Sequence, residues 1–187
     1  DGEFNIPEAV TAIEPYAFYG CSQAVEFTMG DVETIGSYAF YNCSLVECFN
    51  SEVQYKIEIP NTVVSIDSYA FNGMVLITEV YVPDSVTSIG SNAFYNCSTV
   101  NKITVPFIGN NINSTSHFAS ILSGSAQSSI TEIIITTDTT IPSSAFSDCT
   151  SIESITIPET VEIIGSKAFY NCSVLKRLNS KIDGEFN

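Results

Sequence analysis

The residues with the chemistry to act as nucleophiles, redox groups or metal ligands are six cysteines and a single histidine. A Cys–His or Ser–His pair becomes an effective nucleophile when a third group orients the imidazole and an oxyanion-binding loop is present. His117 lies in a Ser-, Asn- and Gly-rich stretch, where Cys48 or a nearby serine could pair with it, but neither further component is evident. The sequence therefore favours a solvated loop histidine over a catalytic one, and we expect a protein that is not an enzyme.

Five cysteines share one position of an internal repeat: Cys21, Cys43, Cys97, Cys149 and Cys172. Met74 takes that position in another copy. Methionine can replace a buried thiol but not half of a disulfide, so the pattern favours a column of reduced, apolar cysteines. Coils stacked about 4.8 Å apart would also bring neighbouring α-carbons within disulfide range, which leaves the pairs Cys21–Cys43 and Cys149–Cys172 as an alternative.

Other signals of bound groups are missing from the sequence. Cys48 stands outside the column, at an outward strand position, and is predicted to be an exposed thiol. No Cys or His spacing is typical of a zinc site, and the sequence has neither a Gly-rich phosphate loop nor a distinct carboxylate pair. We expect no metal and no cofactor.

The element that positions these residues is a repeat of about 23 residues, marked by an Ala-Phe pair. The pair occurs six times: Ala17-Phe18, Ala39-Phe40, Ala70-Phe71, Ala93-Phe94, Ala145-Phe146 and Ala168-Phe169. An isoleucine stands four residues before each Ala and serves as the frame of the coil: Ile13, Ile35, Ile66, Ile89, Ile141 and Ile164. In five copies a valine precedes the frame isoleucine by three residues: Val10, Val32, Val63, Val86 and Val161. Self-similarity at this period predicts a solenoid in which each coil buries its apolar face against its neighbours.

Each coil contains a stretch of alternating apolar and polar residues that predicts a strand, as in Glu153-Ser154-Ile155-Thr156-Ile157. In the regular coils a proline follows and ends the strand. Seven such strands, stacked in parallel, would form a sheet of about 30 Å. The period is too short for a full helix on the return side, which should consist of turns, short extended pieces and short helical turns. The six phenylalanines are predicted to form a buried stack.

Seven residues after the frame isoleucine, every copy has Gly, Asn or Asp: Gly20, Asn42, Gly73, Asn96, Asp148 and Asn171. These residue types tolerate positive φ best, so the position is predicted to be a left-handed turn. A ladder of asparagines that contacts a ligand is the alternative.

Two regions interrupt the repeat. An insertion at Asn50–Lys56 predicts a longer loop. Between Ile89 and Ile141, the residues at about 107–135 are interpreted as one atypical coil, with a short helix at Ser116–Leu122. We therefore expect residues 1–187 to form a single solenoid of about seven coils.

The pattern Ile-Pro-x-x-Val-x-x-Ile-Gly-Ser-x-Ala-Phe-Tyr-Asn-Cys-Ser, seen in the copies beginning at Val82-Pro83 and Ile157-Pro158, resembles the BspA-like leucine-rich repeat. The resemblance covers nearly the whole chain, and departs from the family pattern at Met74 and around Phe107. It implies a mainly β leucine-rich repeat solenoid, with parallel strands on the concave face and turns on the convex side. It also implies a secreted or cell-surface protein, because some members of the family are adhesins that bind host matrix proteins.

Charge limits the partners. The net charge is -15, from 21 acids and six bases, which excludes phosphate-directed nucleic-acid binding and disfavours anionic membranes. No apolar run approaches the roughly 20 residues of a membrane span.

The pentapeptide Asp1–Asn5 recurs at Asp183–Asn187, which predicts a fragment of a longer array with a module of about 182 residues. Such a fragment would expose sheet edges and associate end to end.

The candidate binding site is the outward face of the sheet, which alternation builds from Glu26, Thr28, Asn50, Glu79, Tyr81, Lys102, Thr104, Glu132, Ile134, Ser154, Thr156, Arg177 and Asn179. Tyr81 is its best single anchor, since tyrosine offers a large contact area at a small entropic cost. The sequence thus predicts a non-enzymatic module that binds a protein or glycan. A structural spacer that projects another domain from the cell surface is the alternative.

Overall fold

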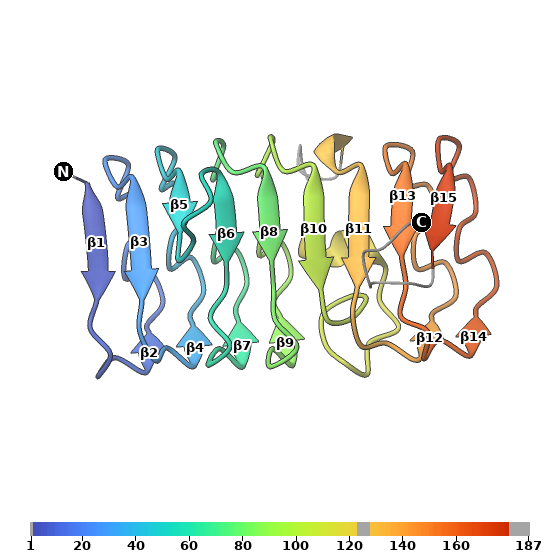
Figure 1. The fold of residues 1–187 in the computed structure, drawn as a ribbon, viewed down its shortest axis with the longest axis horizontal. Helices are drawn as coiled ribbons and strands as arrows, with labels where there is room; N and C mark the ends of the chain where they lie inside the picture. Colours follow the sequence, from blue (N-terminus) through green and yellow to red (C-terminus); the bar gives the residue numbers. More distant parts are fainter. Residues whose placement is uncertain (1, 123–127, 180–187) are drawn as a thin grey trace.

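The computed structural model describes residues 2–122 and 128–179, which wind into a mainly β solenoid (Figure 1). One side of every coil contributes to a nine-stranded sheet in which all neighbouring strands are parallel. Its strands, in spatial order, are β1 (Glu3–Ile6), β3 (Glu26–Met29), β5 (Cys48–Phe49), β6 (Lys56–Glu58), β8 (Glu79–Tyr81), β10 (Lys102–Val105), β11 (Glu132–Ile135), β13 (Ser154–Thr156) and β15 (Arg177–Asn179). The sequence predicted seven of them; β1 and β6 are the two that it missed.

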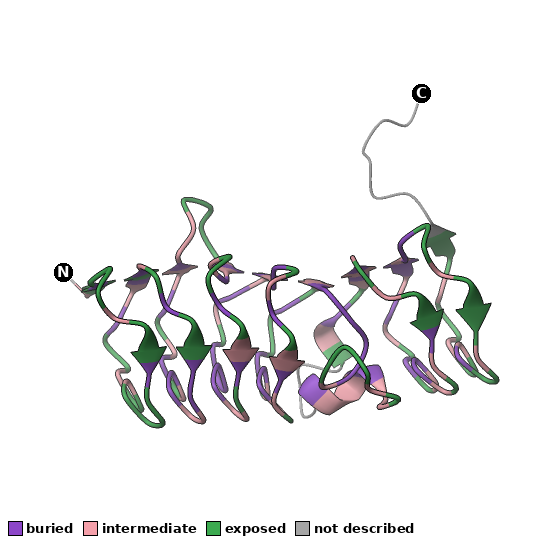
Figure 2. Ribbon diagram, turned by 90° about the horizontal axis from the view of Figure 1, so that it is seen from below, coloured by how far each residue is buried: buried purple, intermediate pink, exposed green. Residues whose placement is uncertain are grey.

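The frame isoleucines lie in a second row of two-residue strands. Four of these strands form one sheet: β2 (Ala12–Ile13), β4 (Thr34–Ile35), β7 (Ser65–Ile66) and β9 (Ser88–Ile89). The other two, β12 (Thr140–Ile141) and β14 (Ile163–Ile164), pair separately. Figure 2 shows the gap between the two groups, where the atypical coil passes with its 3-10 helix η1 (Phe118–Ile121). This helix confirms, in shortened form, the helix predicted at Ser116–Leu122.

The turn side of the coils is also paired through the backbone. The Tyr38 N–H donates to the Ser68 carbonyl (3.1 Å), and two residues later the Phe40 N–H donates to the Ala70 carbonyl (2.8 Å). The Asn42 N–H continues the series. Alternate residues of one coil thus donate to the next coil, so the turn side is joined along the axis in addition to the nine-stranded sheet and the interrupted row of frame strands.

This ladder explains the turn conformations. All six residues of the predicted turn position have φ between 56° and 78°, which confirms the left-handed prediction. A second column, three residues after the frame isoleucine, has φ between 59° and 63° and was not predicted: Tyr16, Tyr38, Tyr69, Asn92, Ser144 and Lys167. For a bulky residue this conformation costs about 1 kcal/mol or more. The conformation is imposed by the ladder, not by residue type, so the sequence carried no signal for it.

The core contains a stack of phenylalanine rings. Phe40, Phe71 and Phe94 are fully buried, and successive rings are parallel with centroids 5.5 Å apart. Phe49, from the sheet, meets Phe40 edge-on at 4.8 Å. In the atypical coil, Phe118 of η1 takes the place of the repeat phenylalanine and packs against Phe146. Its N–H donates to the next coil, as the N–H groups of the other repeat phenylalanines do. The core therefore continues through the irregular segment.

The cysteine column packs against this stack. The Sγ atoms of three cysteines donate to phenylalanine carbonyls of the preceding coil: Cys43 to Phe18 (3.3 Å), Cys97 to Phe71 (3.2 Å) and Cys172 to Phe146 (3.0 Å). All six cysteines of the chain are free. Burial raises the pKa of Cys43, Cys97 and Cys149 to about 12, so these thiols are poor nucleophiles. Their role in the structure is packing and hydrogen bonding to the backbone.

At the gap between β9 and β12, side chains replace the missing backbone partners. In other coils the N–H one residue after the frame isoleucine donates to the frame carbonyl of the preceding coil, as Gly90 does to Ile66 (2.7 Å). Here the amide side chain of Asn110 donates to the Ile89 carbonyl instead (2.9 Å). On the far side of the gap, Pro142 occupies the donor position and has no N–H to offer.

The gap also contains a half-buried acid. Asp138 precedes its frame isoleucine by three residues, where the other five copies have valine. Its Oδ2 accepts a hydrogen bond from the Ile108 N–H (2.7 Å). Burial raises the pKa of Asp138 from 3.8 to about 6, although the hydrogen bond from Ile108 opposes the shift.

No helix in the described ranges is long and apolar enough to span a bilayer. The second copy of the repeated pentapeptide, Asp183–Asn187, lies outside those ranges.

Replacement of Phe94 by alanine should remove the centre of the ring stack and lower the free energy of unfolding by about 3 to 5 kcal/mol. Phe169→Ala is the matched control, because Phe169 is only partly buried in the last coil and should cost less. Urea denaturation of both variants measures the difference. Equal losses would contradict a core that is densest at the centre.

Asp138→Asn should stabilise the fold at pH 7.5 by about 1 to 2 kcal/mol, because it keeps an acceptor for Ile108 and removes a charge whose burial is costly but partly screened by solvent. The raised pKa means that the folded state binds the proton more tightly than the unfolded state. The contribution of Asp138 to stability is therefore fully present below about pH 4 and is lost as the pH rises through about 6. Urea denaturation at pH 4 should show little difference between the Asp138→Asn variant and the wild type. A variant that is less stable than the wild type at pH 7.5 would contradict the raised pKa.

Candidate ligand-binding face

Alternation along the strands brings two rows of side chains to the outer face of the nine-stranded sheet, while their neighbours point to the core. The strand register aligns the first row as Glu3, Glu26, Cys48, Lys56, Glu79, Lys102, Glu132, Ser154 and Arg177. The second row contains Asn5, Thr28, Glu58, Tyr81, Thr104, Ile134 and Thr156. The backbone of Asn179 pairs beside Thr156 in the same register.

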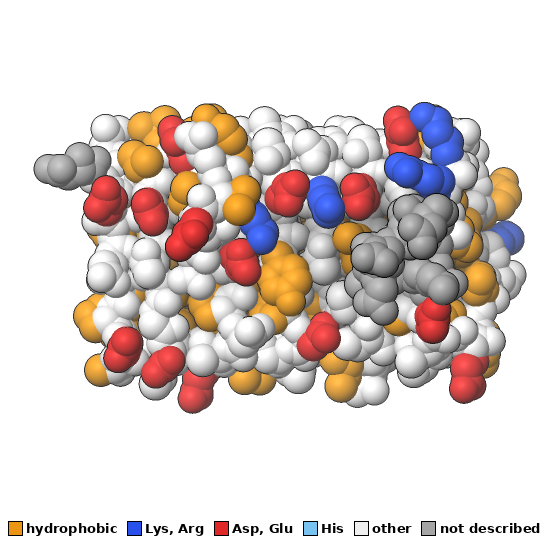
Figure 3. Space-filling model, viewed as in Figure 1, with side chains coloured by type: hydrophobic (Ala, Val, Ile, Leu, Met, Phe, Trp, Pro, Cys, Tyr) orange, Lys and Arg blue, Asp and Glu red, His pale blue; other side chains and the backbone are white. Residues whose placement is uncertain are grey.

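The first row carries an ordered pattern of charge. It begins with acids at β1 and β3, and from Lys56 to Glu132 basic and acidic residues alternate on successive strands (Figure 3). Lys102 Nζ lies 3.5 Å from a carboxylate oxygen of Glu132. Directly opposed like charges destabilise a sheet, so alternation is the arrangement that a parallel ladder tolerates. Three of the chain's six Lys and Arg residues stand in this one row.

Tyr81 lies in the second row and is half-buried. Lys56 Nζ is 5.8 Å from the centroid of its ring, a distance suited to a cation–π interaction. The same ammonium group lies 2.8 Å from an Oε2 oxygen of Glu58. An aromatic ring, a base and an acid therefore meet near the middle of the face.

Lys56 and Glu58 were missed as face residues, because the sequence interpretation placed Lys56 in a loop. The structure corrects this: the insertion ends in strand β6. A signal was present, since Lys56-Ile57-Glu58-Ile59-Pro60 has the alternation and the closing proline of the regular strands. The connection between β5 and β6 rises from the sheet face (Figure 2), and Ser51 Oγ of this loop donates to Glu58 Oε2 (3.4 Å).

The prediction that Asn50 continues its strand is wrong. Asn50 follows β5, has a φ of 53°, and its Oδ1 accepts a hydrogen bond from the Met29 N–H (3.1 Å). Its side chain therefore holds the start of the loop. The remaining predicted positions lie on the face by register, although Ser154 is only 7% exposed.

His117 has a structural role. Its Nδ1 accepts a hydrogen bond from the Ala119 N–H (3.0 Å), which caps η1, and its Nε2 lies 2.7 Å from the Ser147 carbonyl. The two contacts together select the tautomer with the proton on Nε2, and they occupy both nitrogens. In the described part of the chain, no three His, Cys, Asp or Glu side chains are grouped so that they could hold a metal ion.

Comparison with known proteins gives a family and a fold. The sequence profile of the BspA type leucine rich repeat region matches residues 2–52 and 45–176, in six copies. The solved structure of the T. pallidum leucine rich repeat protein TpLRR is similar in fold, with 22% identity and a TM-score of 0.54 over 96% of this chain and 69% of that one. The pneumococcal vaccine antigen PcpA is also similar, with 25% identity and a TM-score of 0.63 over 97% of this chain and 42% of its own. No curated protein matches the chain.

Proposed function

Because the chain belongs to the BspA-type leucine-rich repeat family, we propose that it is a non-catalytic binding module that engages a protein or glycan through the nine-stranded sheet. The observation that carries the proposal is that three of the six basic residues, Lys56, Lys102 and Arg177, stand in one row of the sheet face in a chain with a net charge of -15.

The composition of the face supports the proposal. Repeat proteins use the extended strand face of the solenoid for binding. Tyrosine and arginine are enriched among the side chains that dominate interface energetics, and the face has Tyr81 at its centre and Arg177 on its last strand. The loop between β5 and β6 gives this flat surface a raised border, with the Val53 side chain 57% exposed.

We propose that the module works outside the cell, with host matrix proteins as the first ligand class to test. The similarity to a pneumococcal vaccine antigen supports this location, but PcpA is more than twice as long as the aligned part. The alternative function, a structural spacer, requires no ligand and would leave the face without a partner.

The test compares two cation–π pairs in which the lysine nitrogen lies at the same distance from the centroid of the tyrosine ring. Lys56 and Tyr81 lie on the sheet face, whereas Lys167 and Tyr170 lie on the turn side with the same separation of 5.8 Å. The wild-type protein and the two double alanine variants are compared for capture on a panel of matrix proteins and glycans. The Lys56→Ala/Tyr81→Ala variant should lose capture at least about tenfold, with a Tm within about 2 °C of wild type.

The control pair, Lys167→Ala with Tyr170→Ala, should bind as the wild type does. Equal loss in both double variants would place the site elsewhere. Absence of capture by the wild-type protein across the panel would favour the spacer.

We also propose that copies of this 187-residue chain associate end to end. Ile164 is 52% exposed in the last coil, although the frame isoleucines of the inner coils are almost completely buried. At the other end, Phe4, Ile6 and Phe18 line an apolar depression of about 390 Å³. The two ends are therefore chemically suited to stack as successive coils do.

Light scattering over a range of concentrations should show a mass that rises above the monomer. Ile164→Glu should restore the monomer, whereas Val53→Glu, a control on the exposed loop, should not. A strict monomer at the highest concentration would contradict end-to-end association.

A further inference from the structure

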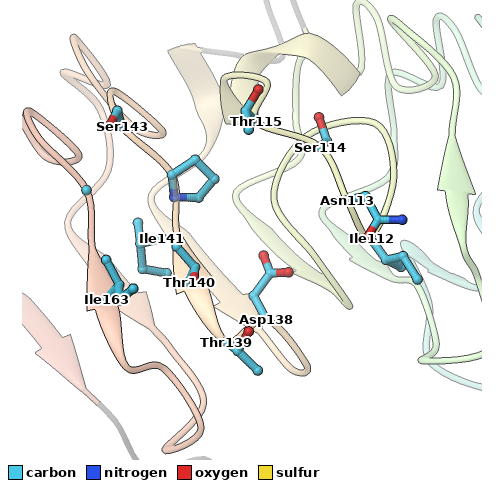
Figure 4. Close-up of a pocket in the computed structure, with 12 residues that line it drawn as sticks. Ile112, Asn113, Ser114, Thr115, Asp138, Thr139, Thr140, Ile141, Ser143 and Ile163 are labelled. Atoms are coloured by element: carbon cyan, nitrogen blue, oxygen red, sulfur yellow. The ribbon is translucent and has the colours of Figure 1, made fainter.

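The gap in the second row of strands contains a groove of about 670 Å³, on a different side of the coil from the nine-stranded sheet. Its walls come from the atypical coil and from the β12 and β14 strands (Figure 4). Ile112 on one wall and Ile163 on the other are more than half exposed. Asp138 lies between these walls, and it is the sole ionisable side chain among the residues that line the groove.

The repeat itself shows that Asp138 is unusual. Five copies have valine at this position, and the valines of the central coils, such as Val63 and Val86, are completely buried. Capping the Ile108 N–H requires only an acceptor, which an uncharged asparagine would supply. Within the described ranges, no Lys, Arg or His forms an ion pair with the Asp138 carboxylate. Its charge therefore has no counterpart in the structure, and a residue that breaks a local rule at a cost in stability is a candidate for function.

The form of the groove disfavours one class of ligand. An extended peptide could add to a free strand edge only by backbone hydrogen bonds. Pro142 removes a donor from the edge beside β12, and Asn110 already satisfies the Ile89 carbonyl on the other edge. Each edge has thus lost one of the backbone groups that strand addition would use, which favours recognition by the lining side chains.

We propose that the groove binds a lysine or arginine side chain of a protein partner. The cationic group pairs with the Asp138 carboxylate, and the aliphatic stem lies between Ile112 and Ile163. Long basic side chains have this combination of an apolar stem and a charged head. The hydroxyl group of Thr140, which lies near Asp138 in the groove (Figure 4), can accept a further N–H bond. The site does not depend on the sheet face and goes beyond the proposed function.

The experiment titrates the 15N-labelled chain with capped pentapeptides, acetyl-Ser-Val-X-Val-Ser-amide, in which X is Lys, Arg or Gln. The Lys and Arg peptides should shift the amide signals of Ile112, Thr140 and Ile163 and bind at least about tenfold more tightly than the Gln peptide, as a charge-assisted hydrogen bond provides. Asp138→Asn should abolish this preference. Asp31→Asn, which removes one charge from an exposed position in an unbroken coil, should retain it.

A second variant tests the stem contact. Ile112→Ser changes an exposed residue, so the fold should persist. It should weaken binding of the Lys peptide more than binding of a peptide in which X is the shorter diaminopropionic acid. Three results would overturn the proposal: equal binding of the Lys and Gln peptides, unchanged Lys binding by Asp138→Asn, or no shift in the groove with up to about 10 mM peptide. Equal affinity for free n-pentylammonium would assign the groove to a small amine and would also overturn the assignment to a protein side chain.

Discussion

Backbone hydrogen bonds between successive coils are the interaction on which the rest of this structure depends. They join the coils on the strand side, through the frame strands and along the turns, where the Phe40 N–H reaches the Ala70 carbonyl. Such a ladder requires each coil to adopt nearly the same backbone as its neighbour. Equivalent residues are therefore stacked directly above one another, and side chains that suit one coil suit the next. The phenylalanine stack and the cysteine column are consequences of this repetition.

The same constraint explains where the molecule departs from regularity. A coil that lacks an identical neighbour must satisfy its backbone by other means, and the atypical coil does so with side chains. Asn110 supplies a donor to Ile89, Asp138 supplies an acceptor to Ile108, and Pro142 removes the need for a partner. These substitutions form a groove instead of a continuous sheet. By contrast, the side chains on the outer face of the nine-stranded sheet take no part in the ladder, so they can vary without disturbing it.

How much could be predicted from the sequence depends on whether a feature comes from residue types that recur at the same position of successive coils. The buried Phe94, the left-handed Asn42 and the strand around Ile155 all follow from residue types that recur at fixed spacing. The left-handed Tyr38 could not be predicted, because the ladder imposes that conformation against the preference of the residue. Strand β6 was missed because the insertion shifts the frame, although alternation and Pro60 marked it. The contact of Lys56 with Tyr81 depends on that shifted strand, and so the centre of the candidate face became visible only in three dimensions.

Amide hydrogen exchange tests the central claim most directly, because it measures the ladder residue by residue. The turn-side N–H groups of Phe40, Asn42 and Gly73 donate to the next coil and should exchange as slowly as those of the central strand β8. Protection should fall toward the first and last coils, where one neighbour is missing. Exchange of these turn amides at the rate of exposed loop residues such as Glu52 would contradict the account, since the coils would then be joined by the strands alone.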